Sequence, residues 1–333
     1  MGRLLVACML GVSATAALAG EPRLGRFEFA RTKMAVPMKV VLYALDSVTA
    51  TEAAEAAYAR IDRLNAILSD YDPQSELRRL SDATSEGKPV PVSRDLWQVL
   101  TRAQALAEQS DGAFDVTIGP VVRLWRRARR RGQLPSPERL RPAMDLVGYR
   151  FVRLDVDSRT VQLLKPEMRL DLGGIAKGYA ADQAIGVLRK FSANRAMIDA
   201  GGDIVLADPP PGKTGWRIAL APLEPRGPPS KVLLLANVAV ATSGDAWQYV
   251  EIAGRRYSHI VDPRTGLGLT DHSSVTVVAP DGVTADGLAS AVSILGPQKG
   301  LKLIEATPGA AAYIIRAPHG KVETYRSNRW KKL

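Results

Sequence analysis

The sequence is poor in cysteine, histidine and aromatic residues. Its 333 residues include one cysteine, three histidines and 6% Phe, Trp and Tyr. The cysteine is Cys8, which lies inside a predicted export signal, so disulfides, thiol catalysis and cysteine-ligated metals are excluded from the mature chain. The stability of the fold must therefore come from an ordinary apolar core, which a hydrophobic fraction of 46% permits.

No apolar run is long enough to span a membrane, and the N-terminal run instead predicts export. Residues 1–19 begin with a positive charge, continue with an apolar stretch over residues 4–12 and end in the small-x-small pattern Ala17-Leu18-Ala19. Cys8 sits in a loose match to a lipoprotein box, but too little hydrophobic sequence precedes it. We therefore expect a periplasmic protein without lipid anchoring, in which residues 20–333 form one domain or two closely joined lobes.

Acidic residues are too few to balance the basic ones. The chain has 45 Lys and Arg against 34 Asp and Glu, a net charge of +11, which favours anionic partners. No nucleic-acid module is recognisable, and export argues against nucleic acid, so we expect none. The run RRARRR, Arg126–Arg131, ends a predicted helix and has two interpretations: a solvated helix face, or a dock for the acidic membrane surface or a target protein.

The spacing of apolar residues predicts an α+β protein, with mainly antiparallel sheets flanked by helices, because strands and helices mix without a regular βαβ rhythm. Helices are predicted over residues 51–68 with Thr51 as the N-cap, 96–109, 116–131, 176–191, 285–295 and 300–305. Strands are predicted over residues 38–45, 195–206, 216–220, 232–241, 249–252, 256–260 and 274–278, with hairpins over 152–164 and 311–325.

The segment LDLGGIAKGYAADQ, Leu170–Gln183, has the features of a phosphate-binding loop. Gly173 and Gly174 let the backbone approach a ligand. The helix that follows offers free amides and the positive end of its dipole, and Lys177 adds a cation. A plain strand-to-helix corner would also use glycine, and the spacing fits neither a nucleoside triphosphate loop nor a dinucleotide fingerprint.

Two later segments repeat this combination of small residues and polar oxygens. In AGGD, Gly202 precedes Asp203, whose carboxylate suits a ribose or a base; the structural alternative is a β-bulge with a turn aspartate. In ATSGD, the hydroxyls of Thr242 and Ser243 suit phosphate; the structural alternative is an ST-turn after a strand.

Two further segments carry proton-transfer and metal-binding chemistry. In YSHIVDPRTG, His259 and Asp262 lie close together, although a lone histidine is more often structural. Asp286 and Ser290 are four residues apart on a predicted helix, so both oxygens face one side, as a hard cation such as Mg²⁺ requires. The structural alternative for Asp286 is a carboxylate favoured by the helix dipole.

Together these segments resemble the ApbE family, the FAD:protein FMN transferases. The similarity runs from about Met34 to about Ile304, and ILSDYDPQSELRRL and GAFDVTIGPVVRLW upstream are similar to the family as well. The resemblance implies an ApbE-like, T-fold-like α+β architecture. It implies Mg²⁺-dependent transfer of the FMN half of FAD to a Thr or Ser hydroxyl of a target flavoprotein, a subunit of a redox complex, with release of AMP. The alternatives are an FAD pyrophosphatase that yields FMN and AMP, and a non-catalytic flavin-binding protein.

The resemblance also implies a role for each matching residue. The implied metal ligands are the Asp286 and Ser290 side chains and the Ala176 carbonyl, and His259 and Asp262 are implied in proton transfer and its support. The implied contacts to FAD are Met34, Tyr71, Asp115, Gly174, Lys177, Gly202, Asp203, Thr242 and Ser243. The chain departs from the family in four places: Met34 is followed by Ala35-Val36 rather than Gly-Thr, Ser81 stands where Asn is expected, Gly287 replaces a common Ala, and Ser290 stands where Thr is usual.

Overall fold

The computed structural model describes residues 23–83, 87–224, 227–229 and 231–333, so the predicted export signal lies outside the described part. The helices in it are α1 (Ser47–Leu68), α2 (Glu76–Ala83), α3 (Arg94–Gln109), α4 (Gly119–Arg131), α5 (Pro137–Met144), α6 (Ala176–Lys190) and α7 (Gly282–Ala306). The strands are β1 (Gly25–Lys33), β2 (Val36–Ala44), β3 (Val90–Pro91), β4 (Val152–Asp155), β5 (Thr160–Leu163), β6 (Ala196–Ala200), β7 (Ile204–Leu206), β8 (Trp216–Ala219), β9 (Val232–Leu235), β10 (Ala239–Gly244), β11 (Tyr249–Ile252), β12 (Arg255–Ser258), β13 (Ser273–Ala279), β14 (Ala311–Arg316) and β15 (Glu323–Arg326).

A central sheet organises the molecule, with strand order β1-β2-β6-β7-β10-β13-β14-β15. Every neighbouring pair in this order is antiparallel, and so are the pairs in the three smaller sheets. The predicted α+β class with mainly antiparallel sheets is therefore confirmed.

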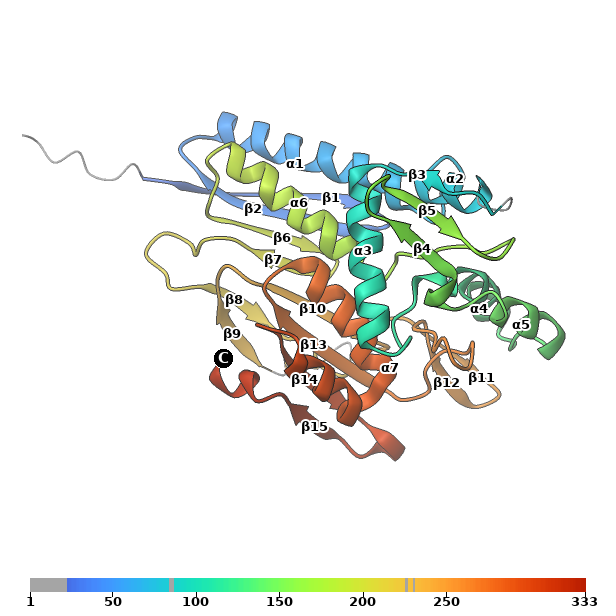
Figure 1. The fold of residues 1–333 in the computed structure, drawn as a ribbon. Helices are drawn as coiled ribbons and strands as arrows, with labels where there is room; N and C mark the ends of the chain where they lie inside the picture. The colour runs from blue at the N-terminus through green and yellow to red at the C-terminus, as the bar shows by residue number, and fades with distance from the viewer. Residues whose placement is uncertain (1–22, 84–86, 225–226, 230) are drawn as a thin grey trace, which may run out of the picture.

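Helices cover one face of the central sheet, and a small hairpin covers the other. Helices α1, α6 and α7 lie along the first face (Figure 1), where Val40, Ile198, Val277 and other alternate strand residues join the main core. The strand residues between them, such as Val41, face a second core that includes the β8–β9 hairpin. This alternation follows from the two-residue period of a strand.

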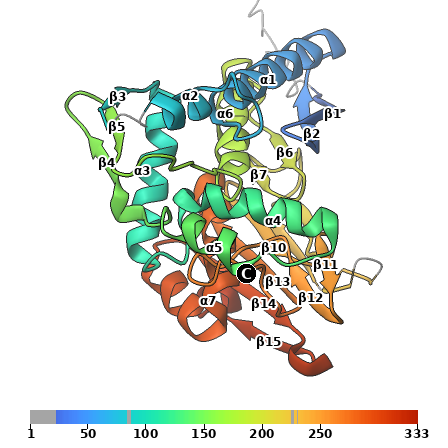
Figure 2. The same ribbon diagram turned by 90° about the vertical axis from the view of Figure 1, so that its right-hand side faces the viewer.

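Helices α4 and α5 and the β11–β12 hairpin form a third apolar cluster beside the central sheet (Figures 1 and 2). Trp125 of α4 packs edge-on against Tyr257 of β12, with ring centroids 5.7 Å apart. The indole N–H of Trp125 also donates to the Ser258 carbonyl oxygen at 3.0 Å. Helix α4 is thereby fixed next to His259.

Several element boundaries differ from those predicted. Helix α1 begins at Ser47, and its N-cap is Asp46, whose carboxylate accepts from the Thr49 amide at 2.8 Å; the prediction that Thr51 caps it was wrong. The strand predicted over residues 195–206 is a hairpin of β6 and β7, because Gly201 and Gly202 turn the chain with φ values of 68° and 101°.

Other differences follow the same physical rules. The strand predicted over residues 232–241 divides into β9 and β10 around Asn237, which has a φ of 54°. The two C-terminal helices predicted over 285–305 correspond to the halves of α7, which kinks at Gly296 before Pro297. Strand β1 and helices α2 and α5 were not predicted. No helix in the described residues is both long enough and apolar enough to cross a membrane.

Candidate active site

Helices α6 and α7 cross in direct backbone contact at two glycines. A Cβ atom on Gly178 would lie 2.0 Å from the carbonyl oxygen of Gly282, and one on Gly282 would lie 2.5 Å from that of Gly178. Side chains larger than hydrogen are excluded at both positions. The crossing brings Lys177, in the first turn of α6, against Asp286 near the start of α7.

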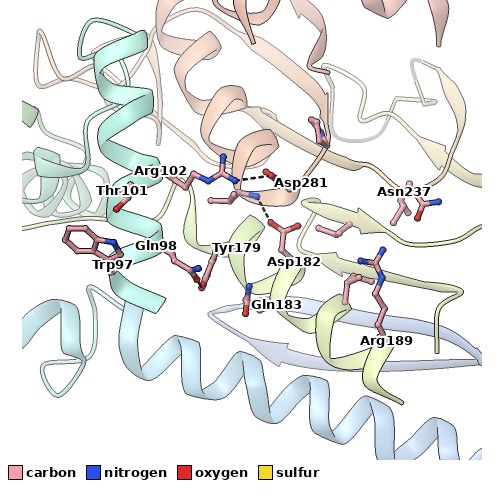
Figure 3. Close-up of a pocket in the computed structure, with 15 residues that line it drawn as sticks. Trp97, Gln98, Thr101, Arg102, Tyr179, Asp182, Gln183, Arg189, Asn237 and Asp281 are labelled. Carbon is pink, nitrogen blue, oxygen red and sulfur yellow. Dashed lines mark hydrogen bonds and ion pairs between the residues drawn. The ribbon is translucent and has the colours of Figure 1, made fainter. Parts of the chain in front are cut away.

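A carboxylate inside the fold holds the two helices together. Asp182 of α6, labelled in Figure 3, lies at the start of α7. Its carboxylate accepts from the Gly282 amide at 2.7 Å and from the Val283 amide at 2.9 Å, so it satisfies free N–H groups of that helix. Burial raises the pKa of Asp182 to about 7. A cavity of ≈ 500 Å³ adjoins Asp182, and no predicted site residue is among the described residues that line it. Asp182 therefore has a structural role: it holds α6 against the start of α7.

Lys177 lies between two buried carboxylates. Its ammonium group forms an ion pair with Asp203, and its Nζ is 3.7 Å from Oδ2 of Asp286. Burial lowers the pKa of Lys177, but the negative charges of Asp286 and Asp203 raise it by more, so the net shift of the pKa is upward. Burial and the neighbouring Asp286 charge raise the pKa of Asp203 to about 7. One cation thus faces two carboxylates, an arrangement that can accept further positive charge.

Small oxygen-bearing residues adjoin Asp286. Ser290 lies one turn further along α7, and its Oγ is 3.4 Å from Oγ of Ser243 on β10. A Cβ on Gly174 would lie only 2.9 Å from Oγ of Ser290, so the glycine loop passes closely over this hydroxyl. A carboxylate with hydroxyl oxygens is the donor chemistry that Mg²⁺ prefers.

The donor set relies on more than carboxylates. No group of three or more His, Cys, Asp or Glu that would hold a metal ion is present among the described residues. A cation beside Asp286 would therefore need the Ser290 hydroxyl and backbone oxygens as well. Gly174 is the loop residue in close approach to Ser290, whereas Ala176 is the first residue of α6. The implied Ala176 carbonyl ligand stays a prediction.

The two hydroxyls of the ATSGD segment point in different directions. Ser243 shares its side of β10 with Ala239 and Ala241, which face the helices, and it approaches Ser290. Thr242 points to the other side, where its Oγ1 lies 3.0 Å from Oγ1 of Thr276. Only Ser243 of this pair is thus brought to the candidate metal ligands, and a phosphate contact by Thr242 stays a prediction.

Two hairpin turns meet beside Lys177. Met34 and Ala35 turn β1 into β2, and Gly201 and Gly202 turn β6 into β7. A Cβ on Gly201 would lie 2.8 Å from Cβ of Val36, so the two turns are in contact. Asp203 follows the second turn, which places Met34, Gly202 and Asp203 at one end of the sheet.

His259 follows β12, and its ring and its backbone both contact the Gln248 carbonyl. Its Nδ1 lies 3.2 Å from the carbonyl oxygen of Gln248, and its backbone N–H donates to the same oxygen at 3.0 Å. With the proton on Nδ1, the lone pair is on Nε2. Burial, assisted by the positive charges of Arg129 and Lys177, lowers the pKa of His259 to about 4. The imidazole is therefore neutral near neutral pH.

Asp262 is paired with Arg264. Its carboxylate accepts from the Arg264 backbone at 2.9 Å and from the Arg264 guanidinium at 2.8 Å. In the described chain the polar contact that orients the His259 ring comes from the Gln248 carbonyl. The role of Asp262 in supporting proton transfer stays a prediction.

The sequence interpretation missed the inward face of α4. Arg126 pairs with Asp70 and with Asp171, the latter at 2.9 Å, and its guanidinium lies 4.1 Å from the ring centroid of Tyr71. Arg129, one turn later, is close enough to His259 to lower its pKa. Arg129 is half-buried and has no ion-pair partner among the described residues. The arginine run is therefore not uniformly a solvated face.

Asp115 and Tyr71, two other predicted FAD contacts, lie in different environments: Asp115 is buried and hydrogen bonded, and Tyr71 is exposed. Asp115 is buried, and its carboxylate accepts from Oγ1 of Thr117 at 2.6 Å and from the Tyr149 amide at 2.7 Å. Its neighbour Phe114 is the side chain that approaches Gly174. Tyr71 is 71% exposed and available to a ligand. Contacts of Asp115 and Tyr71 with FAD stay predictions.

The buried carboxylate of Asp245 anchors the hairpin that precedes His259. The sequence analysis did not predict this role. Asp245, the last residue of ATSGD, accepts from Nε of Arg256 at 2.5 Å, from the Ser273 amide at 3.0 Å, and pairs with Nδ1 of His272 at 2.7 Å. Arg256 belongs to β12 and Ser273 to β13, so Asp245 ties the hairpin to the central sheet. Its position directly after Thr-Ser-Gly was the available signal.

Comparison with known proteins identifies the family of this chain. The chain matches the ApbE family over residues 34–315. A Haemophilus influenzae protein named FAD:protein FMN transferase is 35% identical over 300 residues, which cover 87% of this chain and 86% of that protein. A Treponema pallidum protein of the same name is 32% identical over 346 residues, with coverage of 97% and 94%.

Solved structures show the same architecture. The flavin transferase ApbE from Vibrio cholerae superposes with a TM-score of 0.82 at 27% identity, covering 93% of this chain and 100% of that one. The Pseudomonas stutzeri flavinyl transferase ApbE in its apo form gives a TM-score of 0.81 at 30% identity, covering 93% and 97%. The chain belongs to the ApbE family, and its predicted ApbE-like fold is confirmed.

Proposed function

We propose that this enzyme transfers the FMN moiety of FAD to a Thr or Ser hydroxyl of a target flavoprotein and releases AMP. The observation that carries the proposal is the partly buried Lys177 between the buried carboxylates of Asp203 and Asp286, next to the Ser290 and Ser243 hydroxyls. Membership of the ApbE family and the names of the relatives support the same reaction.

Mg²⁺ is the proposed metal, held by Asp286, Ser290 and backbone oxygen of the glycine loop, with the Ala176 carbonyl as the implied ligand. When bound, Mg²⁺ would neutralise the diphosphate of FAD and polarise the phosphorus that is attacked. Lys177 contributes a fixed positive charge at the same place, since its pKa is raised and it stays protonated. Its pairing with Asp203 orients the ammonium group.

The proposed reaction is a single displacement. The acceptor hydroxyl oxygen forms a bond to the FMN phosphorus of FAD, and the bond from that phosphorus to the bridging oxygen breaks, so AMP leaves with the electron pair. His259 takes the hydroxyl proton on Nε2, because Nδ1 is directed at the Gln248 carbonyl. The nucleophile belongs to the partner, so the enzyme needs no nucleophilic residue of its own.

The target belongs to the compartment into which residues 1–19 would direct the enzyme, and we propose that this is the periplasm. A flavin-carrying subunit of a redox complex, with an accessible Thr or Ser, is the proposed acceptor.

The reaction is tested by incubating the protein with FAD, Mg²⁺ and a Thr-containing candidate flavoprotein, followed by mass spectrometry. An FMN adduct on Thr or Ser supports the transferase. Free FMN and AMP without an adduct indicate a pyrophosphatase instead, and FAD that stays bound and intact indicates a binding protein.

The metal assignment is tested by two ligand variants and one control variant on α7. Ser290→Ala and Asp286→Asn should each lower Mg²⁺-dependent transfer by at least about 100-fold. Ser293→Ala is the control: the Ser293 hydroxyl donates to the Ala289 carbonyl at 2.9 Å within α7, and this variant should retain activity. Wild-type rates in Asp286→Asn would contradict the assignment.

A further inference from the structure

A hollow of ≈ 330 Å³ lies between α4 and α5, and none of the predicted site residues lines it. Its apolar lining includes Leu124 and Leu134, the latter 41% exposed. Its charged lining consists of Arg127, Arg131 and Arg139, all exposed. The hollow thus combines a concave apolar surface with a cationic rim.

The positive charge around this hollow is uncompensated. Residues 119–141 contain eight arginines and a single acidic residue, Glu138. Arg126 pairs with carboxylates on the inward side of α4. Within the described chain, Arg127, Arg131 and Arg139 have no ion-pair partner, so their charges are directed at solvent or at a ligand.

Fold stability does not account for this cluster. Arg127 and Arg131 are four residues apart on one helix, a spacing at which like charges destabilise the helix. Arg139 lies in the first turn of α5 (Pro137–Met144), where the helix dipole disfavours a cation. Only Arg131, at the end of α4, has a favourable position in its helix dipole. An anionic partner would remove the repulsion.

The hollow and the site share helix α4 as a common wall. Residues advance by about 100° per position around a helix, so Arg127 and Arg131 project from nearly the opposite side to Arg126 and Arg129. Trp125 fixes the same helix to the Ser258 carbonyl, next to His259. A partner held in the hollow would therefore be positioned by the helix that also borders the catalytic histidine.

We propose that the hollow docks an acidic segment of the target flavoprotein, in which carboxylates flank an apolar side chain. The carboxylates pair with Arg127, Arg131 and Arg139, and the apolar side chain packs on Leu124 and Leu134. A concave surface with an apolar floor suits a peptide, whereas a flat lipid surface would not reach that floor. The identity of the partner rests on the proposed function; the chemistry of the ligand does not.

Binding is measured first, by fluorescence anisotropy with a labelled peptide of sequence Asp-Glu-Leu-Asp-Glu-Leu-Asp-Glu. The variant Arg127→Gln/Arg131→Gln/Arg139→Gln should bind it at least about tenfold more weakly than the wild type. The control Arg63→Gln/Arg153→Gln/Arg217→Gln removes the same charge from exposed positions elsewhere and should bind within about twofold of the wild type. A peptide with Ser in place of Leu should also bind more weakly.

Three results would overturn the docking site. Equal losses in the two triple variants would show a general charge effect. An unchanged affinity in the first variant would remove the arginines from the interface. Binding of phosphatidylglycerol vesicles, but not of the peptide, that depends on the same arginines would assign the surface to lipid.

Measurements of KM and kcat distinguish a failure of the docking proposal from a failure of the proposed function. With an acceptor flavoprotein that the wild type modifies, the first variant should raise the KM for that protein about tenfold and leave kcat and FAD affinity unchanged. An unchanged KM in an active enzyme refutes docking. A wild type that binds the peptide but transfers no FMN refutes the proposed function and leaves the binding site in place.

Discussion

The backbone N–H of Gly178 donates a hydrogen bond to Oδ2 of Asp286 at 3.1 Å, across 108 residues of sequence. This bond joins the first turn of α6 to the first turns of α7. It exists because glycine at 178 and 282 lets the two backbones touch. The carboxylate that we assign to the metal is thus positioned by a helix crossing, and the geometry of the site depends on that crossing staying closed.

Replacing Gly178 with Ala should open the crossing. Its Cβ would overlap the Gly282 carbonyl and lie 2.9 Å from Cβ of Asp286, and neither backbone can yield without moving a helix. We expect a loss of about 3 kcal/mol or more in the free energy of unfolding, as for other overpacked buried positions. Urea denaturation monitored by circular dichroism measures it.

Gly186→Ala is the matched control on the same helix. A Cβ at Gly186 meets nothing within 4 Å, and alanine is the better helix former, so this variant should be about 0.5–1 kcal/mol more stable than the wild type. A Gly178→Ala protein as stable as Gly186→Ala would contradict the proposed packing.

Local rules predicted the parts of the site that lie on one element. Asp286 and Ser290 could be placed on one face of a helix because residues four apart lie on the same side. The glycine loop before α6 could be recognised directly from its two adjacent glycines. Their approach to Lys177 and Asp203 depends on contacts between segments about 100 residues apart, which no local pattern encodes.

The errors have identifiable physical causes. Asp46 and Thr51 are both suitable N-caps, and only the structure shows that Asp46 is used. Gly201-Gly202 permits either a bulge or a two-residue turn, and β6 and β7 pair through the turn. The inward arginines of α4 were missed because a continuous basic run has no periodicity; Asp171 and Asp70 select Arg126 from it.

His259 should stay unprotonated well below the usual histidine range. Its pKa is lowered to about 4, so the ring keeps its base form at neutral and mildly acidic pH. As the pH falls below about 6.5, the unfolded chain takes up this proton first, so the His259 contribution to stability is lost as the pH falls toward 4. Imidazole NMR can follow the residue directly, because the chain has three histidines. A midpoint near 6.5 would contradict the burial-driven shift.

His259→Ala should slow transfer by about 100-fold or more while FAD binding is retained, because the residue acts on the proton of the acceptor. Single-turnover transfer and equilibrium FAD binding measure the two effects separately. Lost FAD affinity with transfer rates otherwise normal at saturating FAD would make His259 a ligand contact rather than a base.

Arg129 should act on FAD and on His259 together. It is a half-buried cation without an ion-pair partner in the described chain, near both His259 and Tyr71. Arg129→Gln should raise the pKa of His259, since one opposing charge is removed, and weaken FAD binding about tenfold. Isothermal titration calorimetry and imidazole NMR measure these changes.

Arg129→Lys keeps the charge and should preserve most of the His259 shift. Arg130→Gln removes a neighbouring exposed charge and should change neither property measurably. If Arg130→Gln matched Arg129→Gln in both measurements, the effect would come from net charge and not from the position of Arg129.

The β1–β2 turn, Met34-Ala35, has both residues in the left-handed backbone region, and Ala35 is the one whose strain can be tested. Met34 and Ala35 have φ values of 49° and 62°, a region that glycine adopts at little cost and alanine does not. Ala35→Gly should therefore raise the free energy of unfolding by about 0.5–1 kcal/mol, the relief of strain exceeding the extra entropy of the unfolded chain. Ala30→Gly, in the extended strand β1, should lower it by about as much. Urea denaturation compares the two variants. An Ala35→Gly protein no more stable than the wild type would contradict the predicted strain. It would show that contacts around Val36 and Gly201 offset the free-energy cost of the left-handed conformation of Ala35.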